Sequence, residues 1–206
     1  MIGGAAGLTA IGAFAVELGR VWRRGSAPLP AEADSVTAAA VEAAVETTDV
    51  AVAGYQAAPA QENALFNLFA SFVVSLLASR AIAFLLRDRH RVGPFRNVRV
   101  KNRHIHHFVP GIALAFASGA VAIVTRDEDL EPRLALLFGT GMGMTMDEAA
   151  LLLELDDVYW TEEGLLSFQI GFGLVGLLGA LAIGLRFLRR GEAQVLPHEN
   201  GPTLTP

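Results

Sequence analysis

Three histidines in one short run are the residues of this chain best suited to metal binding or proton transfer. His104, His106 and His107 lie where a basic segment meets an apolar one, in the run Arg103-His-Ile-His-His-Phe108. Neutral imidazole binds divalent Zn, Fe or Mn, and it also transfers protons near neutral pH. The run therefore predicts either a metal site or a proton relay.

Acidic residues inside a later apolar stretch could complete such a site. Asp147 and Glu148 lie within this stretch, and Glu154 closes it. An ionised carboxylate is costly at membrane depth, so an intramembrane acid indicates a functional site. The predicted ligands of a Zn, Fe or Mn ion are therefore His104, His106, His107, Asp147, Glu148 and Glu154. The other polar residues expected at this site are Arg80, Gln169 and Tyr159.

The absence of cysteine limits the chemistry that such a site can perform. No thiol is present in the chain, which excludes disulfides, thiolate metal ligands and a cysteine nucleophile. The pattern His-x-His-His matches neither the His-Glu-x-x-His of zincins nor the His-x-x-His-His of membrane desaturases. The residues indicate a metal bound by imidazole and carboxylate ligands, and they identify no reaction.

The same residues also allow interpretations that need no metal. Arg80 could neutralise Asp147 or Glu148 as a buried structural ion pair, with the histidines at the membrane interface. The functions left open are a metal-binding membrane protein or metal-dependent hydrolase, a structural or regulatory membrane component, and a small transporter subunit. A transporter of so few helices would have to form a homo-oligomer to enclose a path.

The elements that would position these residues are apolar blocks of membrane-spanning length. Hydrophobic residues make up 52% of the 206, and they are gathered into blocks. A helix needs roughly 20 residues to cross the hydrocarbon core, and lipid leaves no partner for exposed backbone groups. The sequence predicts an all-α transmembrane bundle over residues 63–190, with four core helices at 64–86, 107–125, 134–153 and 165–188.

Three further segments flank this bundle. Residues 1–25 form an apolar segment that could be a fifth transmembrane helix, an interfacial helix or a weakly ordered leader. Residues 26–62 are acidic and rich in alanine, which predicts a linker that could carry an exposed helix over 34–52. Residues 191–206 are rich in proline and are expected to be disordered.

Helix order brings the polar residues to one end of the bundle. Consecutive helices joined by short loops run antiparallel, so the end of each helix meets the start of the next. The histidines open the second core helix, and Asp147 and Glu148 lie near the end of the third. Arg80 lies near the end of the first helix and Gln169 near the start of the fourth. We therefore expect all these groups in one membrane layer.

Charge in the loops predicts orientation and partners. The loop over residues 87–104 holds seven Lys or Arg residues, so the positive-inside rule places it in the cytoplasm of a multi-pass cell-membrane protein. Tyr159 and Trp160 are typical of an aromatic belt at the headgroups. The bilayer is the expected partner, and the net charge of -5 gives no indication of nucleic acid.

Glycines predict where helices approach closely. Gly139, Gly141 and Gly143 repeat at every second position of one apolar stretch, and further glycines recur in the last stretch. Small residues let membrane helices pack backbone against backbone. Pro110 and Gly111 suit the first turn and the packing of the second core helix.

Three motifs in order resemble an uncharacterised family of small prokaryotic polytopic integral membrane proteins. They are His104-Ile-His-His-Phe108 with Gly111, then Met146-Asp-Glu148, then Asp157-Val-Tyr-Trp160. The resemblance covers roughly residues 98–170. It implies a multi-span membrane protein and draws attention to His106, His107, Asp147 and Glu148, and it implies no activity.

Overall fold

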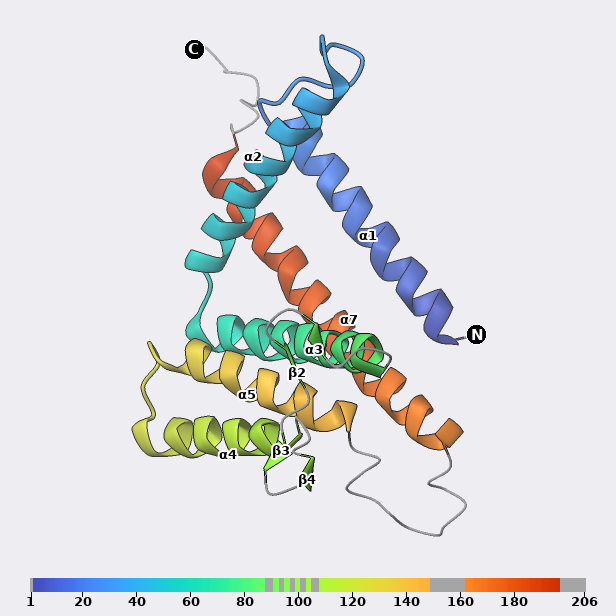
Figure 1. The fold of residues 1–206 in the computed structure, drawn as a ribbon. Coiled ribbons are helices and arrows are strands. Elements are labelled where there is room, and N and C mark those ends of the chain that lie inside the picture. The colour runs from blue at the N-terminus through green and yellow to red at the C-terminus, as the bar shows by residue number, and fades with distance from the viewer. Residues whose placement is uncertain are drawn as a thin grey trace, which may run out of the picture. The chain divides into compact units, whose positions relative to one another are not determined.

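Helices dominate the chain, as the sequence predicts (Figure 1). The structure is a computed structural model that describes residues 2–87, 91–92, 95–96, 99–100, 103–104, 108–148 and 162–196. Its helices are α1 (Ile2–Arg24), α2 (Val36–Gln56), α3 (Ala60–Arg87), α4 (Phe108–Thr125), α5 (Glu131–Asp147) and α7 (Glu162–Val195). The predicted all-α class is confirmed for the long elements.

Two short β-hairpins were not expected from the sequence. The first pairs β1 (Arg91–Val92) with β2 (Phe95–Arg96), and the second pairs β3 (Arg99–Val100) with β4 (Arg103–His104). Both hairpins are antiparallel and lie between α3 and α4 in the chain. Two-residue strands are too short to show a period-two pattern, so the sequence predicts only a loop here.

Three described helices are long and apolar enough to cross a membrane. They cover Ala60–Leu85, Phe108–Thr125 and Gln169–Val195. Many of their large side chains face outward, and Phe84, Phe116 and Val124 expose 71, 76 and 81% of their surface. Apolar surface of this extent is costly in water and favourable in lipid. These helices fit an integral membrane protein.

The predicted spans match the observed helices to different degrees. Residues 64–86 and 107–125 correspond to α3 and α4, and 165–188 lie within α7. The predicted span 134–153 overlaps α5, which has 17 residues and ends at Asp147. Residues 149–161 lie outside the described residues. A fourth core span and a fifth span at α1 therefore stay predictions.

The chain divides into two compact units, of which the first covers residues 60–180. In this unit α5 contacts both α3 and α4, and it lies between them (Figure 1). A Cβ on Gly143 would lie 2.5 Å from the Phe72 carbonyl oxygen of α3, and one on Gly141 would lie 2.5 Å from the Gly111 carbonyl oxygen of α4. Tight contact through the α5 glycines is therefore confirmed.

The first part of α7 packs on α3 in the same unit. A Cβ on Gly176 would meet the Phe72 ring at 2.9 Å, and one on Gly179 would meet the Phe69 ring at 2.7 Å. The rings of α3 thus fill the space that these two glycines leave. This contact places Gln169, two turns earlier on α7, beside the ends of α3 and α5.

The second unit covers residues 2–59 and 181–206. Its buried apolar core consists of Val21 from α1, Val50 from α2, Leu188 from α7 and Leu196. The helix α2 begins at the N-cap residue Ser35, whose hydroxyl accepts the N–H of Ala38 at 3.4 Å. A side-chain acceptor of this kind satisfies one of the free N–H groups at a helix start.

Two flanking segments contain helices. The helix expected over 34–52 corresponds to α2 (Val36–Gln56), and its small residues Ala39, Ala43 and Gly54 are buried although an exposed helix was expected. Alanine and glycine add little apolar mass but permit close packing, which composition alone does not reveal. The tail expected to be disordered from residue 191 is helical as far as Val195, and residues 197–206 lie outside the described residues.

Candidate functional site

An ion pair joins α3 and α5 at one end of the first unit. Arg80 Nε lies 2.8 Å from Asp147 Oδ1. The Asp147 side chain is 2% exposed, whereas that of Arg80 is 56% exposed. A carboxylate this deeply buried is costly unless a cation compensates it, and Arg80 supplies that cation.

Gln169 adds α7 to this ion pair. Its Nε2 donates to the backbone carbonyls of Met146 at 3.0 Å and Asp147 at 2.9 Å. Its Oε1 accepts a hydrogen bond from Arg80 Nη2, which also donates to the Asp147 carbonyl at 3.4 Å. The last carbonyls of a helix have no partner within it and carry partial negative charge. Arg80 and Gln169 therefore cap the end of α5.

Glu148 performs the corresponding role at the start of α4. Its Oε2 accepts the backbone N–H of Phe108, the first residue of α4, at 3.1 Å. A carboxylate is favourable at a helix start because the free N–H groups there carry partial positive charge. Glu148 thus caps the start of α4, whereas Arg80 and Gln169 cap the end of α5.

The sequence-predicted site residues have three different outcomes. Arg80, Asp147 and Gln169 come together, and Glu148 lies at the start of α4. The backbone of His104 lies in β4. His106, His107, Glu154 and Tyr159 lie outside the described residues. Among the described residues, no group of three or more His, Asp or Glu residues could hold a metal. The metal ligand set therefore stays a prediction.

The arrangement around Asp147 favours charge neutralisation over metal binding at that residue. One Asp147 oxygen lies against the guanidinium of Arg80, and a metal ion there would meet this fixed positive charge. Like charges in a poorly solvated site repel strongly.

A second charged cluster lies in the second unit, between α1 and the end of α7. Arg189 Nε lies 2.7 Å from Glu17 Oε1. Arg20 Nη2 and Arg24 Nη1 lie 2.8 and 3.0 Å from the two oxygens of Glu192. Glu17 and Glu192 are 4 and 3% exposed. The three arginines thus compensate two buried carboxylates.

Sequence reasoning did not predict this second cluster, although a signal was present. Glu17 and Arg20 lie three residues apart in an otherwise apolar helix, and their side chains pair at 3.2 Å. Charged residues in an apolar helix indicate a buried partner. Their partners on α7 are far away in the sequence, and Arg20 and Glu192 are 172 residues apart.

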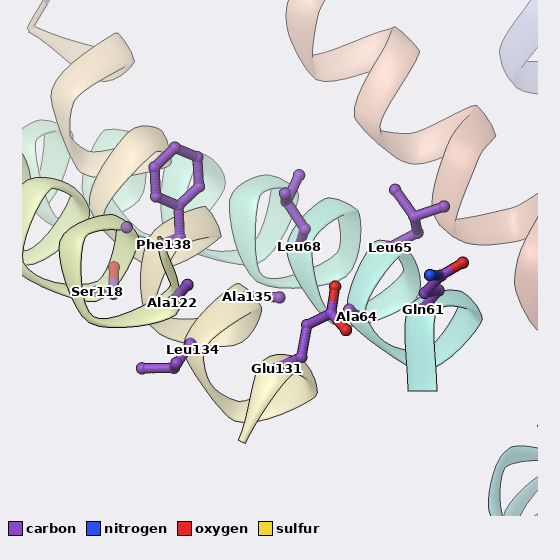
Figure 2. Close-up of a pocket in the computed structure, with 11 residues that line it drawn as sticks. Gln61, Ala64, Leu65, Leu68, Ser118, Ala122, Glu131, Leu134, Ala135 and Phe138 are labelled. Atoms are coloured by element: carbon purple, nitrogen blue, oxygen red, sulfur yellow. The ribbon is translucent and has the colours of Figure 1, made fainter. Parts of the chain in front are cut away.

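An apolar groove lies between α3, α4 and α5, away from the polar cluster. Its volume is about 420 Å³, and Leu68, Ala122 and Phe138 are among its lining residues (Figure 2). Gln61 and Glu131 contribute an amide and a carboxylate. A ligand site usually places several polar groups to fix orientation, and this lining is mostly apolar. The groove suits a hydrocarbon chain and identifies no particular ligand.

Comparison of the chain with protein-family models, with curated proteins and with solved structures gave no match. The resemblance carried by the His-Ile-His-His, Asp-Glu and Tyr-Trp motifs therefore stays a prediction.

Proposed function

We propose that this protein is a structural component of the membrane whose Arg80–Asp147–Gln169 cluster fastens α3, α5 and α7 to one another. The single observation behind this proposal is the 2.8 Å ion pair between Arg80 and the buried carboxylate of Asp147. Two charges that neutralise each other across helices stabilise one arrangement of those helices. This role was one of the alternatives that the sequence left open.

The position of Arg80 supports this role. Arg80 lies five residues before the end of the span Ala60–Leu85, which is about 8 Å of helix. An arginine at that depth can extend its guanidinium toward the headgroups while its stem stays in an apolar layer. The exposed part of Arg80 can therefore remain solvated while its Nε holds Asp147.

Replacing Arg80 tests the proposal. In Arg80→Leu the buried carboxylate loses its cation, and we expect a loss of about 3 kcal/mol in the free energy of unfolding. Thermal unfolding of the purified protein in detergent measures this loss. Arg126→Leu is the matched control, because Arg126 lies at the other end of α4 in an exposed turn. Equal stability of Arg80→Leu and the control would reject the structural role.

Metal binding at the histidines is the second candidate function, and the position of Glu148 favours it. The Glu148 carboxylate bonds the N–H of Phe108, which directly follows His107 in the chain. A carboxylate beside a run of imidazoles is a usual donor set for Zn, Fe or Mn. In this second candidate function Glu148 is a metal ligand, whereas Asp147 pairs with Arg80.

Elemental analysis separates the two candidates. Protein purified without chelators from metal-replete cells would contain close to one Zn, Fe or Mn per chain if the histidines bind metal. His107→Ala would then lose the metal. Under the structural proposal alone, purified protein carries no bound transition metal and His107→Ala unfolds at the same temperature as the parent protein.

A further inference from the structure

The apolar groove between α3, α4 and α5 begins at the edge of two candidate membrane spans. Its residues Gln61 and Ala64 lie in the first two turns of the span Ala60–Leu85. Its residue Ala122 lies three residues before the end of the span Phe108–Thr125. The start of one span and the end of the other thus border the same groove, which places its rim close to the headgroups.

The interior of the groove extends into the layer of the acyl chains. Leu68 lies eight residues into its span and Ser118 seven residues before the end of the other, which is about 11 Å of helix. Leu65, which also lines the groove, is 49% exposed, so the groove is open on one side. Its volume of about 420 Å³ lies within the range of roughly 300–1,000 Å³ that is usual for ligand sites. An acyl chain is the apolar ligand that a surrounding bilayer supplies in excess.

A smaller polar pocket adjoins the rim of the groove. It has a volume of about 270 Å³ and shares Ala122, Glu131 and Leu134 with the groove. Its other lining residues are Arg126, Asp127 and Glu128. Three carboxylates against one guanidinium give this pocket an excess of negative charge. An apolar groove and a negatively charged pocket therefore meet at the same residues.

Glu131 is the charged residue at which the groove and the polar pocket meet. Figure 2 shows its carboxylate directed toward Ala64, between α5 and α3. Within the part of the chain that the structure describes, no group forms a hydrogen bond or an ion pair with this carboxylate. Asp127, by contrast, accepts the N–H of Asp129 at 2.9 Å and so stabilises the turn before α5. Glu131 is therefore the carboxylate best placed to bind a cation at the rim.

We propose that this site binds a phospholipid with a primary ammonium headgroup, such as phosphatidylethanolamine, with one acyl chain in the groove and the ammonium beside Glu131. A primary ammonium donates charge-assisted hydrogen bonds to a carboxylate, whereas the quaternary ammonium of a choline headgroup has no N–H to donate. A soluble cation would use the polar pocket alone and would leave the apolar groove unfilled. The inference rests on the membrane assignment and is independent of the role proposed for Arg80.

Lipid-dependent thermal stability tests this proposal. The full chain in a neutral detergent is unfolded alone and with phosphatidylethanolamine, phosphatidylcholine or phosphatidylglycerol of the same acyl chains. We expect phosphatidylethanolamine to raise the unfolding temperature by several degrees more than either of the other lipids. An equal rise with either of them would overturn the assignment to a primary ammonium headgroup. Glycerophosphoethanolamine carries the same headgroup without acyl chains, and a rise with it as large as that with phosphatidylethanolamine would overturn the role of the groove.

Charge-matched variants test the contact with the headgroup. Glu131→Gln should lose at least half of the difference between phosphatidylethanolamine and phosphatidylcholine, because an amide carries no charge to bind the ammonium. Asp129→Asn removes one negative charge from the turn before α5 at a residue outside the linings of both cavities, and it should keep the whole difference. If the two variants lose equal parts of the difference, the ammonium does not bind at Glu131.

A substitution that fills the groove tests the position of the acyl chain. Ala122→Leu places a larger side chain in the groove and should lose at least half of the rise that phosphatidylethanolamine causes. Ala113→Leu makes the same change at an exposed position of α4 and should keep the whole rise. Each rise is measured from the unfolding temperature of the same variant without lipid, so a change in the stability of the variant itself does not affect the comparison. A full rise in Ala122→Leu would show that the acyl chain lies elsewhere.

Discussion

Single polar side chains at the end of the first unit form hydrogen bonds with backbone groups at the ends of helices. Gln169 donates to two carbonyls at the end of α5, and Glu148 accepts the first N–H of α4. Arg80 neutralises Asp147 and adds a donor to the same helix end. In an apolar environment, unpaired groups of this kind cost more than they do in water. The cluster therefore stabilises the helix ends, whether or not it also performs any chemistry.

Substitution of Glu148 tests its role at the start of α4. Glu148→Gln keeps an oxygen that can accept the Phe108 N–H, whereas Glu148→Ala removes the acceptor. We expect Glu148→Ala to lower the free energy of unfolding by about 1 kcal/mol and Glu148→Gln to lower it by less than half of that. Chemical denaturation in detergent measures both. Equal losses in the two variants would contradict a hydrogen-bonding role.

Helices of the first unit are placed by contacts that only glycine allows. The glycines of α5 lie against the backbones of α3 and α4, and those of α7 lie against rings of α3. Such contacts provide close van der Waals packing, which replaces the hydrophobic driving force that is absent within lipid. They also fix the rotation of α5, and so they determine that Asp147 lies beside Arg80.

Two glycine-to-alanine substitutions should change the unfolding temperature in opposite directions. A Cβ on Gly143 would overlap Ser75 Oγ and lie 2.5 Å from the Phe72 carbonyl oxygen, whereas one on Gly171 meets nothing within 4 Å. Alanine is intrinsically better than glycine in a helix by about 1 kcal/mol. Gly171→Ala should therefore raise the unfolding temperature, and Gly143→Ala should lower it. Stabilisation by Gly143→Ala would show that α5 and α3 are not in close contact.

At the scale of the whole chain, the second unit is held together by partners far apart in sequence. The N-terminal helix α1 and the last part of α7 join through Glu17 with Arg189 and through Arg20 and Arg24 with Glu192. Both carboxylates are buried, so removal of either one leaves arginines without their counter-charge. The first and last parts of the chain thus stabilise each other.

Glu192→Gln tests this connection between the ends of the chain. We expect a loss of about 2 kcal/mol, because an amide cannot compensate the two arginines that the carboxylate serves. Glu42→Gln on the exposed side of α2 should change stability by less than about 0.5 kcal/mol. Thermal unfolding in detergent compares the two. A Glu192→Gln protein as stable as the control would mean that the α1–α7 pairing contributes nothing to the fold.

Local patterns predicted those features that depend on neighbouring positions in the sequence. Apolar block length predicted α3 and α4, and alternation of helix direction predicted that Arg80, Asp147 and Gln169 would meet. The α5 glycines predicted the tight contacts. Each of these inferences needs only the order of helices and the residue types within one helix.

Long-range pairings and very short strands could not be predicted in the same way. Nothing near Glu17 identifies Arg189 as its partner, since their separation of 172 residues leaves no local pattern. The choice of Asp147 over Glu148 for Arg80 depends on the rotation of α5, which is set by packing. The ligand set of the histidines depends on residues outside the described part of the chain.

A double-mutant cycle at Arg80 and Asp147 tests the central claim most directly. The free energy of unfolding is measured for the parent protein, Arg80→Met, Asp147→Asn and the double variant. Because Arg80 is half-exposed, we predict a coupling energy of about 1 kcal/mol or more, with the double variant more stable than the sum of the single losses implies. Strictly additive losses would show that the two side chains do not interact and would contradict the convergence of these helices on one polar cluster.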